Sequence, residues 1–416
     1  MRIAKSITKE GGDINMKVRN LLKGRGVAYS FIVGTLVLLV LIVFLPACAP
    51  APEETGLYGE YVSSLPEGCE PVPRECFEQA MEEGELHFYN WAEWWPEDIY
   101  QGFSQEFGIN FVPDYFGDYD EMVAKYKLDP KINHDLTYPD QRGFRQLREL
   151  GVVENEINYD WLPNVKRYLS PEVAERVWDD VRGASGYYKY SLPVEFGFVN
   201  YVYNSKYIDE SDPRLSSWAL LFEGEEYAGK ISMKNDMFDC IGSALKYLGY
   251  SWNSDDEEEL MEAKEVLLRQ KPWVMAYESW PIRLLLEEEA WISHSWTGDS
   301  WFINQEDENI MGVLPVEGSL ISTDTFIMPI GCTHPAAAHL FMNYVFRPEI
   351  NALLMETIGY TPTHTATPEL LSEELRKWPG VLYPEGYLNK CEIIDPRAYT
   401  GKGLELRTEI WEELKT

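Results

Sequence analysis

The 416-residue chain is long enough for two or three domains, and its 45% hydrophobic and 14% aromatic residues supply sizeable cores. The net charge is −33; the first 48 residues contribute a net +5, which leaves −38 for the rest. So acidic a body excludes nucleic acid as a partner and favours cations.

The beginning of the chain reads as an export signal. A basic segment precedes an uncharged run at residues 27–45, and Cys48 follows a small residue. This pattern is similar to a bacterial lipoprotein signal, with Cys48 as the lipidated first residue of the mature protein. An uncleaved anchor is the alternative, because the 19 uncharged residues approach the ~20 that span a bilayer. Either way we expect the body outside the cytoplasm, in the periplasm or on the outer face of the membrane, with residues 1–48 as the signal and 49–84 as a linker.

The cysteines and histidines predict no metal or cofactor site. Cys69 and Cys76 are spaced for a small disulfide loop in an oxidising compartment, and the isolated Cys240, Cys332 and Cys391 read as buried thiols. There is no CxxC or Cys/His ligand spacing, and the six histidines form no HExxH-like pair.

The segment 86–120 reads as strand, aromatic turn, helix, strand and acidic-aromatic loop. A helix is expected to start at Pro96 and to end at Gly108. Trp91, Trp94 and Trp95 crowd the turn before it. Because ligands in open α/β sheets bind beyond the carboxyl ends of the strands, this turn is expected to form one wall of a ligand cleft.

Strands and helices then alternate, which favours an α/β fold. Strands are expected at residues 135–138, 188–203 (paired strands), 230–233, 273–276, 290–296 and 325–328. Helices are expected at residues 144–150, 239–248, 258–269, 281–289, 335–346, 348–358 and 368–375.

Acids and aromatics at strand ends are the candidates for binding chemistry. Asp236 and Asp239 stand where a strand gives way to a helix, so both can point above the sheet; helix capping is an equally good reading. Asp324 precedes an apolar strand, and Trp296 ends another beside a glycine that permits close approach to the backbone.

Residues 85–410 resemble the spermidine/putrescine-binding proteins of bacterial ABC importers. The matching motifs, in order, are FYNW-x-E-W from Phe88, HDLTYP from His134, YSLP from Tyr190, GKISMKNDMFDCIGSALKYLGYS from Gly229, HSWTGDS from His294, STDTFIMP from Ser322, FRPEIN from Phe346 and ETIGYTPT from Glu356.

The resemblance implies a two-lobed periplasmic-binding-protein fold of type II, in which the chain crosses between the lobes and the cleft lies at their interface. Lobe 1 is expected to comprise residues 85–199 and 325–368, and lobe 2 residues 200–324 and 369–416. Hinge closure would trap a protonated polyamine, which a membrane permease would then receive.

The resemblance also implies the ligand contacts. Carboxylates would replace the water around each ammonium, and aromatic faces would add cation–π attraction of ~0.5–2 kcal/mol. The family's anchoring acids fall on Asp236, Asp239 and Asp324, and its aromatic wall on Trp91, Trp94, Trp296 and Tyr360.

The chain also departs from the family pattern. Ser322 replaces a stacking aromatic, so Trp95, Phe196 or Trp301 is expected to supply that face. Extra charged residues are expected near the ligand at Asp140, Arg142, Glu195, Glu278, Asp299 and Glu392. We hypothesise that the additional carboxylates serve a longer or more highly charged polyamine, with Arg142 neutralising one or two of them.

The function that follows is that of a monomeric, lipid-anchored receptor and not an enzyme. One alternative keeps the receptor but changes its ligand to another small cation or a metal ion. Another is a carboxylate-dependent glycoside hydrolase, since tryptophans and paired acids also suit sugars.

Overall fold

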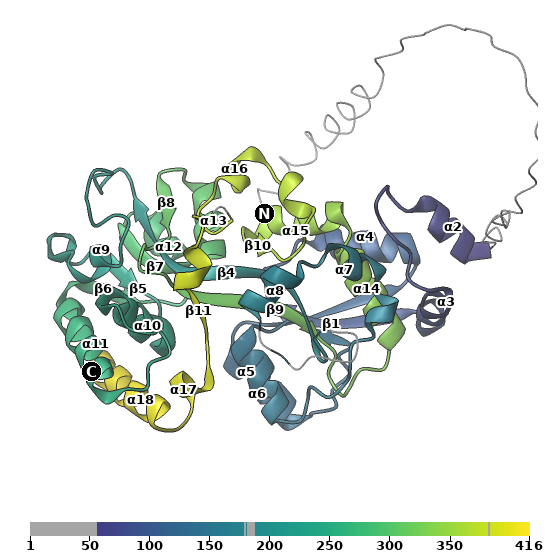
Figure 1. Ribbon diagram of the computed structural model, residues 1–416, viewed down its shortest axis with the longest axis horizontal. Coiled ribbons are helices and arrows are strands. Elements are labelled where there is room, and N and C mark those ends of the chain that lie inside the picture. Colours follow the sequence, from purple (N-terminus) through teal and green to yellow (C-terminus); the bar gives the residue numbers. More distant parts are fainter. Residues whose placement is uncertain (1–55, 179, 181–187, 382) are drawn as a thin grey trace, which may run out of the picture. The chain divides into compact units, whose positions relative to one another are not determined.

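The structure is a computed structural model, and it describes residues 56–178, 180, 188–381 and 383–416. The expected signal segment, including Cys48, lies outside the described residues. Figure 1 shows the described elements coloured along the sequence. Among them, no helix combines the length and the apolar character needed to cross a membrane.

The described strands form one mixed, open sheet in the order β2-β1-β3-β9-β4-β7-β5-β6, with β8 and β10 also pairing with β4 and β11 with β9. The strands are β1 (Glu85–Trp91), β2 (Asn110–Phe116), β3 (Leu136–Thr137), β4 (Ser191–Asn204), β5 (Ile231–Met233), β6 (Val274–Tyr277), β7 (Ile292–Trp296), β8 (Ile310–Val313), β9 (Leu320–Ile327), β10 (Thr361–Pro362) and β11 (Glu392–Ile393).

Two antiparallel strands carry the chain from one half of the sheet to the other. All 14 residues of β4 are buried; its first half pairs with β9 and its second half with β7 and β8. Strand β9 pairs with β11 at its beginning and with β3 at its end. Figure 1 shows β4 and β9 running between the elements of the two halves. The segment expected as paired strands is therefore one continuous crossing strand.

Helices cover the sheet, and most of the helices that the sequence pattern predicts are present among them. They are α4 (Glu97–Phe107), α5 (Tyr119–Leu128), α6 (Gln141–Glu149), α7 (Pro163–Tyr168), α8 (Pro171–Val177), α9 (Ala219–Phe222), α10 (Met237–Leu248), α11 (Glu257–Gln270), α12 (Ile282–Leu286), α13 (Thr297–Glu306), α14 (Pro335–Val345), α15 (Pro348–Ile358), α16 (Glu373–Arg376), α17 (Pro396–Tyr399) and α18 (Gly401–Lys415). As expected, α4 ends at Gly108, whose φ of 68° suits glycine. The helix expected at 368–375 is instead a 3₁₀ turn followed by the short α16.

Two large hydrophobic cores lie in the two halves. The first, which we call core 1, draws its buried residues from 58–194 and 301–378, and the second, core 2, from 199–320 and 394–414. Each core therefore collects segments that are distant in sequence, as expected of a chain that crosses between lobes. The proposed lobe boundaries stay a prediction, and core 1 also includes Trp301, Leu371, Leu375 and Trp378, which that prediction assigns to lobe 2.

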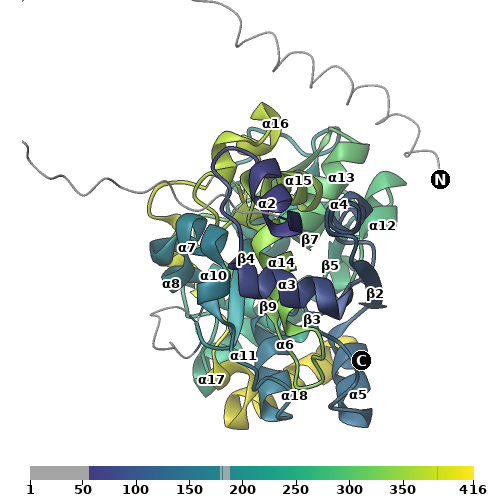
Figure 2. The ribbon, with the colours of Figure 1, turned by 90° about the vertical axis from the view of Figure 1, so that its right-hand side faces the viewer.

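Residues 56–83 correct the prediction of a linker. They form α2 (Gly56–Ser64) and α3 (Arg74–Glu83), and α3 buries Phe77 and Ala80 in core 1. Helix α3 packs on α14 (Figure 2), and Tyr61 of α2 stacks on Phe77 with ring centroids 4.8 Å apart. The apolar residues hidden among the Glu and Pro of this segment are thus part of the fold.

The expected disulfide is also absent from the described residues. Cys69 and Cys76 are both free thiols. The Cys76 sulfur faces α14, 3.7 Å from the Ala336 carbonyl oxygen, whereas Cys69 lies 3.9 Å from the Glu349 carboxylate. The short spacing of Cys69 and Cys76 in the sequence predicted a disulfide, but α3 directs the Cys76 thiol toward core 1.

Because α3 packs in core 1, truncating Phe77 is expected to destabilise the folded protein, which truncation within a linker would not do. Phe77→Ala is expected to lower the free energy of unfolding by about 3–5 kcal/mol, because it removes a buried ring from core 1. Leu57→Ala in the neighbouring helix is the control, since Leu57 is 69% exposed and its loss is expected to cost under ~0.5 kcal/mol. Urea unfolding measures both, and equal stabilities of the two variants would contradict the docked arrangement.

Candidate ligand-binding site

Asp236 links the two halves of the molecule. It is the N-cap of α10, where one carboxylate oxygen accepts hydrogen bonds from the backbone N–H groups of Phe238 (2.8 Å) and Asp239 (3.0 Å). The other oxygen accepts from Arg142 of α6 at 2.8 Å. Burial acts to raise the pKa of Asp236, but the Arg142 guanidinium and the backbone donors outweigh it and hold the pKa below its usual value. The capping role and the proposed cleft position are therefore compatible.

Arg142 is held by two acids from different helices. Besides Asp236, its Nε lies 3.5 Å from a carboxylate oxygen of Asp140. Asp140 caps α6 by accepting the N–H of Gly143 at 2.9 Å. The guanidinium also lies over the Tyr119 ring, 5.2 Å from its centroid. Arg142 thus neutralises an acid on each side, which is the internal neutralisation that the sequence suggested.

Asp239, in the first turn of α10, is different because the nearby charges of Arg142 and Lys234 only partly offset its burial. Its side chain is fully buried, and neither carboxylate oxygen has a hydrogen-bond partner among the described residues. Burial, followed by the negative charge of Asp236, raises the pKa of Asp239 well above its ordinary value. A buried carboxylate without donors is costly, so this position favours an incoming cation.

A second internal cation, Lys234, lies beside the same helix. Its ammonium nitrogen is 3.1 Å from a carboxylate oxygen of Asp299 in α13 and 5.9 Å from the Trp296 ring centroid. Both charged side chains are almost fully buried. Burial, and then the nearby Lys234 charge, lowers the pKa of His294 to about 3, so His294 is neutral.

Two more carboxylates face each other on the crossing strands. Glu195 of β4 and Asp324 of β9 are directly paired in register, and both are buried. One Glu195 oxygen accepts the Tyr138 hydroxyl, and the other has no partner among the described residues. Burial raises the pKa of Glu195 and of Asp324 well above the usual range, and the Asp324 charge raises that of Glu195 further. This pair therefore also lacks a positive charge.

The acids converge on Tyr360, which places them in one region. Burial raises its pKa well above the ordinary value, and four carboxylates add to the effect: Asp140, Glu195, Asp299 and Asp324. The Tyr360 ring lies 5.4 Å from that of Trp94. A Cβ at Gly298 would come within 2.7 Å of Tyr360 and 2.9 Å of Trp94, so glycine is needed for this aromatic contact.

We name six carboxylates together the acidic centre: Asp140, Glu195, Asp236, Asp239, Asp299 and Asp324. Arg142 and Lys234 are the two cations that the structure places against it. The aromatic side chains beside the centre are half-buried or buried. Trp91 meets Phe116 at 4.4 Å and Tyr119 at 4.9 Å, measured between ring centroids. Six acids against two bases leave more buried carboxylates than the two cations can pair.

Several residues expected near the ligand are exposed, paired with other groups or packed in the interior. Glu278 is exposed at the end of β6. Glu392 forms an ion pair with Lys246 and accepts the backbone N–H of Trp252 at 2.9 Å, so it anchors β11 to the end of α10. The three substitutes proposed for the aromatic missing at Ser322 are packed in the interior with at most 6% of their surface exposed: Trp95, Phe196 and Trp301.

Sequence reasoning missed two residues of the site. Tyr119 lies next to Trp91 and Arg142, and the charges of Asp140 and Asp324 reach its hydroxyl. Tyr119 belongs to the acidic-aromatic loop at the end of the segment 86–120, and this position was the available sequence signal for a site residue. Lys234 stands two residues before Asp236, and its basic side chain next to the candidate acids was the available signal.

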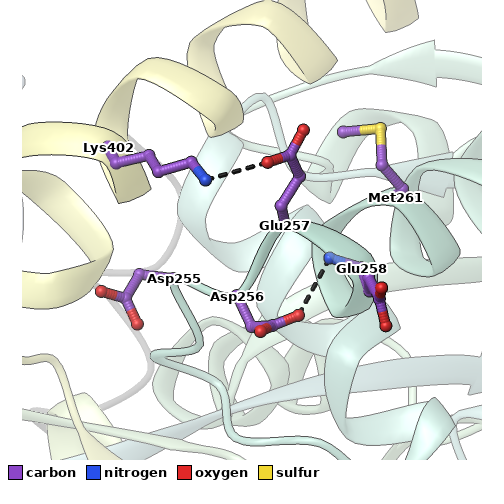
Figure 3. Close-up of a pocket in the computed structure, with 6 residues that line it drawn as sticks. All are labelled: Asp255, Asp256, Glu257, Glu258, Met261 and Lys402. Atoms are coloured by element: carbon purple, nitrogen blue, oxygen red, sulfur yellow. Dashed lines mark hydrogen bonds and ion pairs between the residues drawn. The ribbon is translucent and has the colours of Figure 1, made fainter.

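An acidic pocket elsewhere is separate from this centre. It lies between the beginning of α11 and α18 and is lined by Asp255, Asp256, Glu257, Glu258, Met261 and Lys402. Figure 3 shows Lys402 paired with Glu257 at 2.9 Å, and Asp256 accepting the Glu258 N–H at 2.9 Å as the cap of α11. These acids form a solvated face and a helix cap, as their run in the sequence predicts.

Two cores joined by crossing strands, with buried charges contributed from both, define a two-lobed solute-binding protein. The model of the bacterial extracellular solute-binding protein family matches residues 98–382, and the chain belongs to this family. The family consists of binding proteins, and the fold is the type II periplasmic-binding-protein fold of the solved relatives.

Named relatives and solved structures agree with this assignment. A Salmonella typhimurium spermidine/putrescine-binding periplasmic protein is 29% identical over 74% of this chain and 85% of its own. A Pseudomonas aeruginosa putrescine/cadaverine-binding protein is 24% identical over 81% and 95%. The structure of a Streptococcus pneumoniae spermidine/putrescine ABC transporter substrate-binding protein superimposes with a TM-score of 0.70 at 22% identity, covering 80% of this chain and 98% of that one.

The opposite environments of Asp236 and Asp239 predict opposite effects of removing their charges. Asp236→Asn is expected to lower the free energy of unfolding by about 1.5–3 kcal/mol, because it weakens a charged hydrogen bond to buried Arg142. Asp239→Asn is expected to stabilise the ligand-free protein at neutral pH, because it removes an uncompensated buried carboxylate. Urea unfolding of ligand-free protein at a series of pH values measures both changes.

The contribution of Asp239 to the free energy of unfolding depends on pH with a definite sign. The raised pKa of folded Asp239 means that the folded state binds more protons than the unfolded state between about pH 4, where an unfolded Asp titrates, and the raised value. Stability from this group is therefore lost as the pH rises through that window. The advantage of Asp239→Asn should grow with pH and vanish below about pH 4; a pH-independent difference would contradict it.

Proposed function

We propose that this protein is the extracytoplasmic substrate-binding component of a polyamine ABC importer, which captures a protonated polyamine and delivers it to a membrane permease. The observation that carries the proposal is the uncompensated acidic centre, above all the unpartnered carboxylate of Asp239. Its support from relatives is that several are named as spermidine- or putrescine-binding proteins.

A polyamine fits this centre because it offers what the centre lacks. Its ammonium groups would supply charge and donors to buried carboxylates, which otherwise pay the cost of desolvation. Its methylene chain suits the faces of Trp94, Trp296 and Tyr360, and aromatic faces also attract ammonium groups. An anionic or neutral solute would leave the carboxylates uncompensated.

The pairing of the extra acids points to a short ligand rather than a long one. Arg142 pairs with Asp140 and Asp236, and Lys234 pairs with Asp299. Glu392 has its own lysine, and Glu278 is exposed. The acids left for a ligand are Asp239, Asp324 and Glu195, which suits a diamine or a triamine. The pairing of Asp140, Asp299 and Glu392 weakens the longer-ligand hypothesis, which stays a prediction because Glu195 keeps an oxygen without a partner among the described residues.

Hinge closure would couple binding to delivery. The Arg142–Asp236 bond joins α6, which packs in core 1, to α10, which packs in core 2. A ligand held between Asp239 on one side and Asp324 on the other would favour the closed state through contacts that the open state lacks. The bound solute would then be presented to the permease unchanged, without catalysis. We further propose a monomer, tethered to the membrane through lipidated Cys48.

Binding measurements test the proposal directly. Isothermal titration with putrescine, spermidine and spermine is expected to give tighter binding of putrescine or spermidine than of spermine. Asp239→Asn should weaken binding of the preferred amine by about 2–5 kcal/mol, because it removes the carboxylate that the ammonium pairs with. Glu278→Gln is the matched control and should bind like the parent, since Glu278 is exposed. Absence of binding to all three amines would overturn the proposal.

Lys234 is expected to limit the length of the ligand. Lys234→Met leaves Asp299 buried without its cation, so an additional ammonium becomes favourable there. The ratio of spermine affinity to putrescine affinity should rise about tenfold, which corresponds to ~1.4 kcal/mol. Competition binding measures the ratio. Lys206→Met, which removes an exposed lysine paired with Glu288 and Asp307, should leave it unchanged; the same ratio in both variants would refute this role.

A further inference from the structure

Glu85, His87 and His334 meet at the opposite end of β1 from Trp91. Glu85 and His87 are two residues apart in β1, so their side chains leave the same face of the strand. His334 is the residue before α14. The Glu85 Oε1 atom lies 3.2 Å from His87 Nε2 and 3.6 Å from His334 Nε2. One ligand atom from each residue lies within 4.8 Å of the other two, and all three side chains are half-buried.

A buried acid behind the cluster orients the His334 ring and holds the backbone of His87. Asp135 is fully buried, and one of its oxygens lies 2.9 Å from His334 Nδ1 and accepts the backbone N–H of His87 at 2.8 Å. Its other oxygen accepts the backbone N–H groups of Thr333 and His334. Asp135 thus holds the strand residue and the helix residue in one arrangement.

The same contacts decide which His334 nitrogen carries hydrogen. Beside Asp135, Nδ1 lies 3.2 Å from the Thr333 hydroxyl, but that hydroxyl donates to Asn133 at 2.7 Å. Nδ1 therefore faces acceptors and must donate. In a neutral imidazole this leaves Nε2 as a lone pair aimed at the Glu85 carboxylate. Either a proton on Nε2 or a metal ion between the two atoms satisfies both of them.

We propose that Glu85, His87 and His334 form a binding site for a divalent transition-metal ion of the Zn²⁺ type. Two imidazoles and a carboxylate are donors that zinc accepts at about 2.0–2.1 Å, which in a tetrahedral site separates neighbouring donors by roughly 3.3–3.4 Å. The separations of 3.2 and 3.6 Å bracket that value. Asp135 supplies the carboxylate that metal-binding histidines commonly donate to. Solvent completes the coordination at this half-buried position.

This site is independent of the acidic centre. Glu85 and Trp91 are the first and last residues of β1, six residue steps apart, a distance of roughly 20 Å along an extended strand. A bound ion would tie the beginning of β1 to the start of α14, two elements that are distant in sequence. It would therefore stabilise the folded state. The free energy of unfolding would rise with the logarithm of the ratio between the free ion concentration and the dissociation constant of the site.

Zinc titration of the full-length protein tests the proposal. After chelator treatment, the parent should bind one Zn²⁺ with a micromolar or tighter dissociation constant, and Co²⁺ in its place should give the absorption spectrum of a site with nitrogen and oxygen donors. His334→Ala, His87→Ala and Glu85→Gln should each weaken binding about 100-fold or more, at least as much as loss of an outer-shell partner. Thermal unfolding of each variant confirms that it folds.

Two controls separate this site from other acids. Glu82→Gln changes an exposed carboxylate on the neighbouring α3, and Asp239→Asn changes the acidic centre; both should retain the parent's zinc affinity. Lack of stoichiometric zinc binding at about 10 μM by the parent, or full affinity in both histidine variants, would overturn the proposal. Loss of zinc binding in Asp239→Asn alone would assign the ion to the acidic centre and overturn it as well.

Discussion

Buried negative charge is the constraint on which this structure depends. A carboxylate removed from water needs a cation or several donors, or its pKa rises until it is neutral. The acidic centre follows each of these routes: Asp236 is paired, Asp299 is paired, and Asp239 has a strongly raised pKa. The described residues supply two cations for these six acids, so Asp239, Glu195 and Asp324 have no ion pair and their pKa values rise. The carboxylates without a cation partner therefore indicate a positively charged ligand, and this indication is stronger than any from the shape of the protein surface.

The fold delivers the charges by pointing two helix beginnings at one region. Asp140 caps α6 and Asp236 caps α10, and these helices pack in different cores. Helix N-termini stabilise negative charge through free N–H groups and the macrodipole, which agrees with the lowered pKa of Asp236 beside Arg142. Crossing strands β4 and β9 contribute the other pair, Glu195 and Asp324, from the floor between the cores. Residues far apart in sequence thus meet because the N-termini of α6 and α10 and the crossing strands β4 and β9 all reach the acidic centre.

The sequence predicts the parts that obey local rules. Glycine stops, helix caps and apolar alternation locate α4, α10, α15 and β1, and the motifs locate Asp236, Asp239 and Tyr360. Long-range pairing is not visible in such patterns: nothing local shows that Lys234 meets Asp299 or that Glu392 meets Lys246. Composition also misleads at residues 56–83, where Glu and Pro outnumber a few aromatics that nevertheless reach core 1. Sequence neighbours mislead at Trp95. It follows two site tryptophans in the sequence, but its ring points into the core and packs on Tyr138 and Phe326.

The arrangement of the acids also argues against glycoside hydrolysis. That chemistry needs one carboxylic acid and one carboxylate with distinct roles, set about 5–9.5 Å apart around the bond to be broken. Here Asp140 and Asp236 are occupied as helix caps and as partners of Arg142, and Asp299 is held by Lys234. Glu195 and Asp324 both have raised pKa values for the same reason, burial, so neither is distinguished as the base. A neutral sugar would compensate none of these charges, whereas an alkyl-ammonium compensates those that the chain leaves free, and a binding protein needs no more than that.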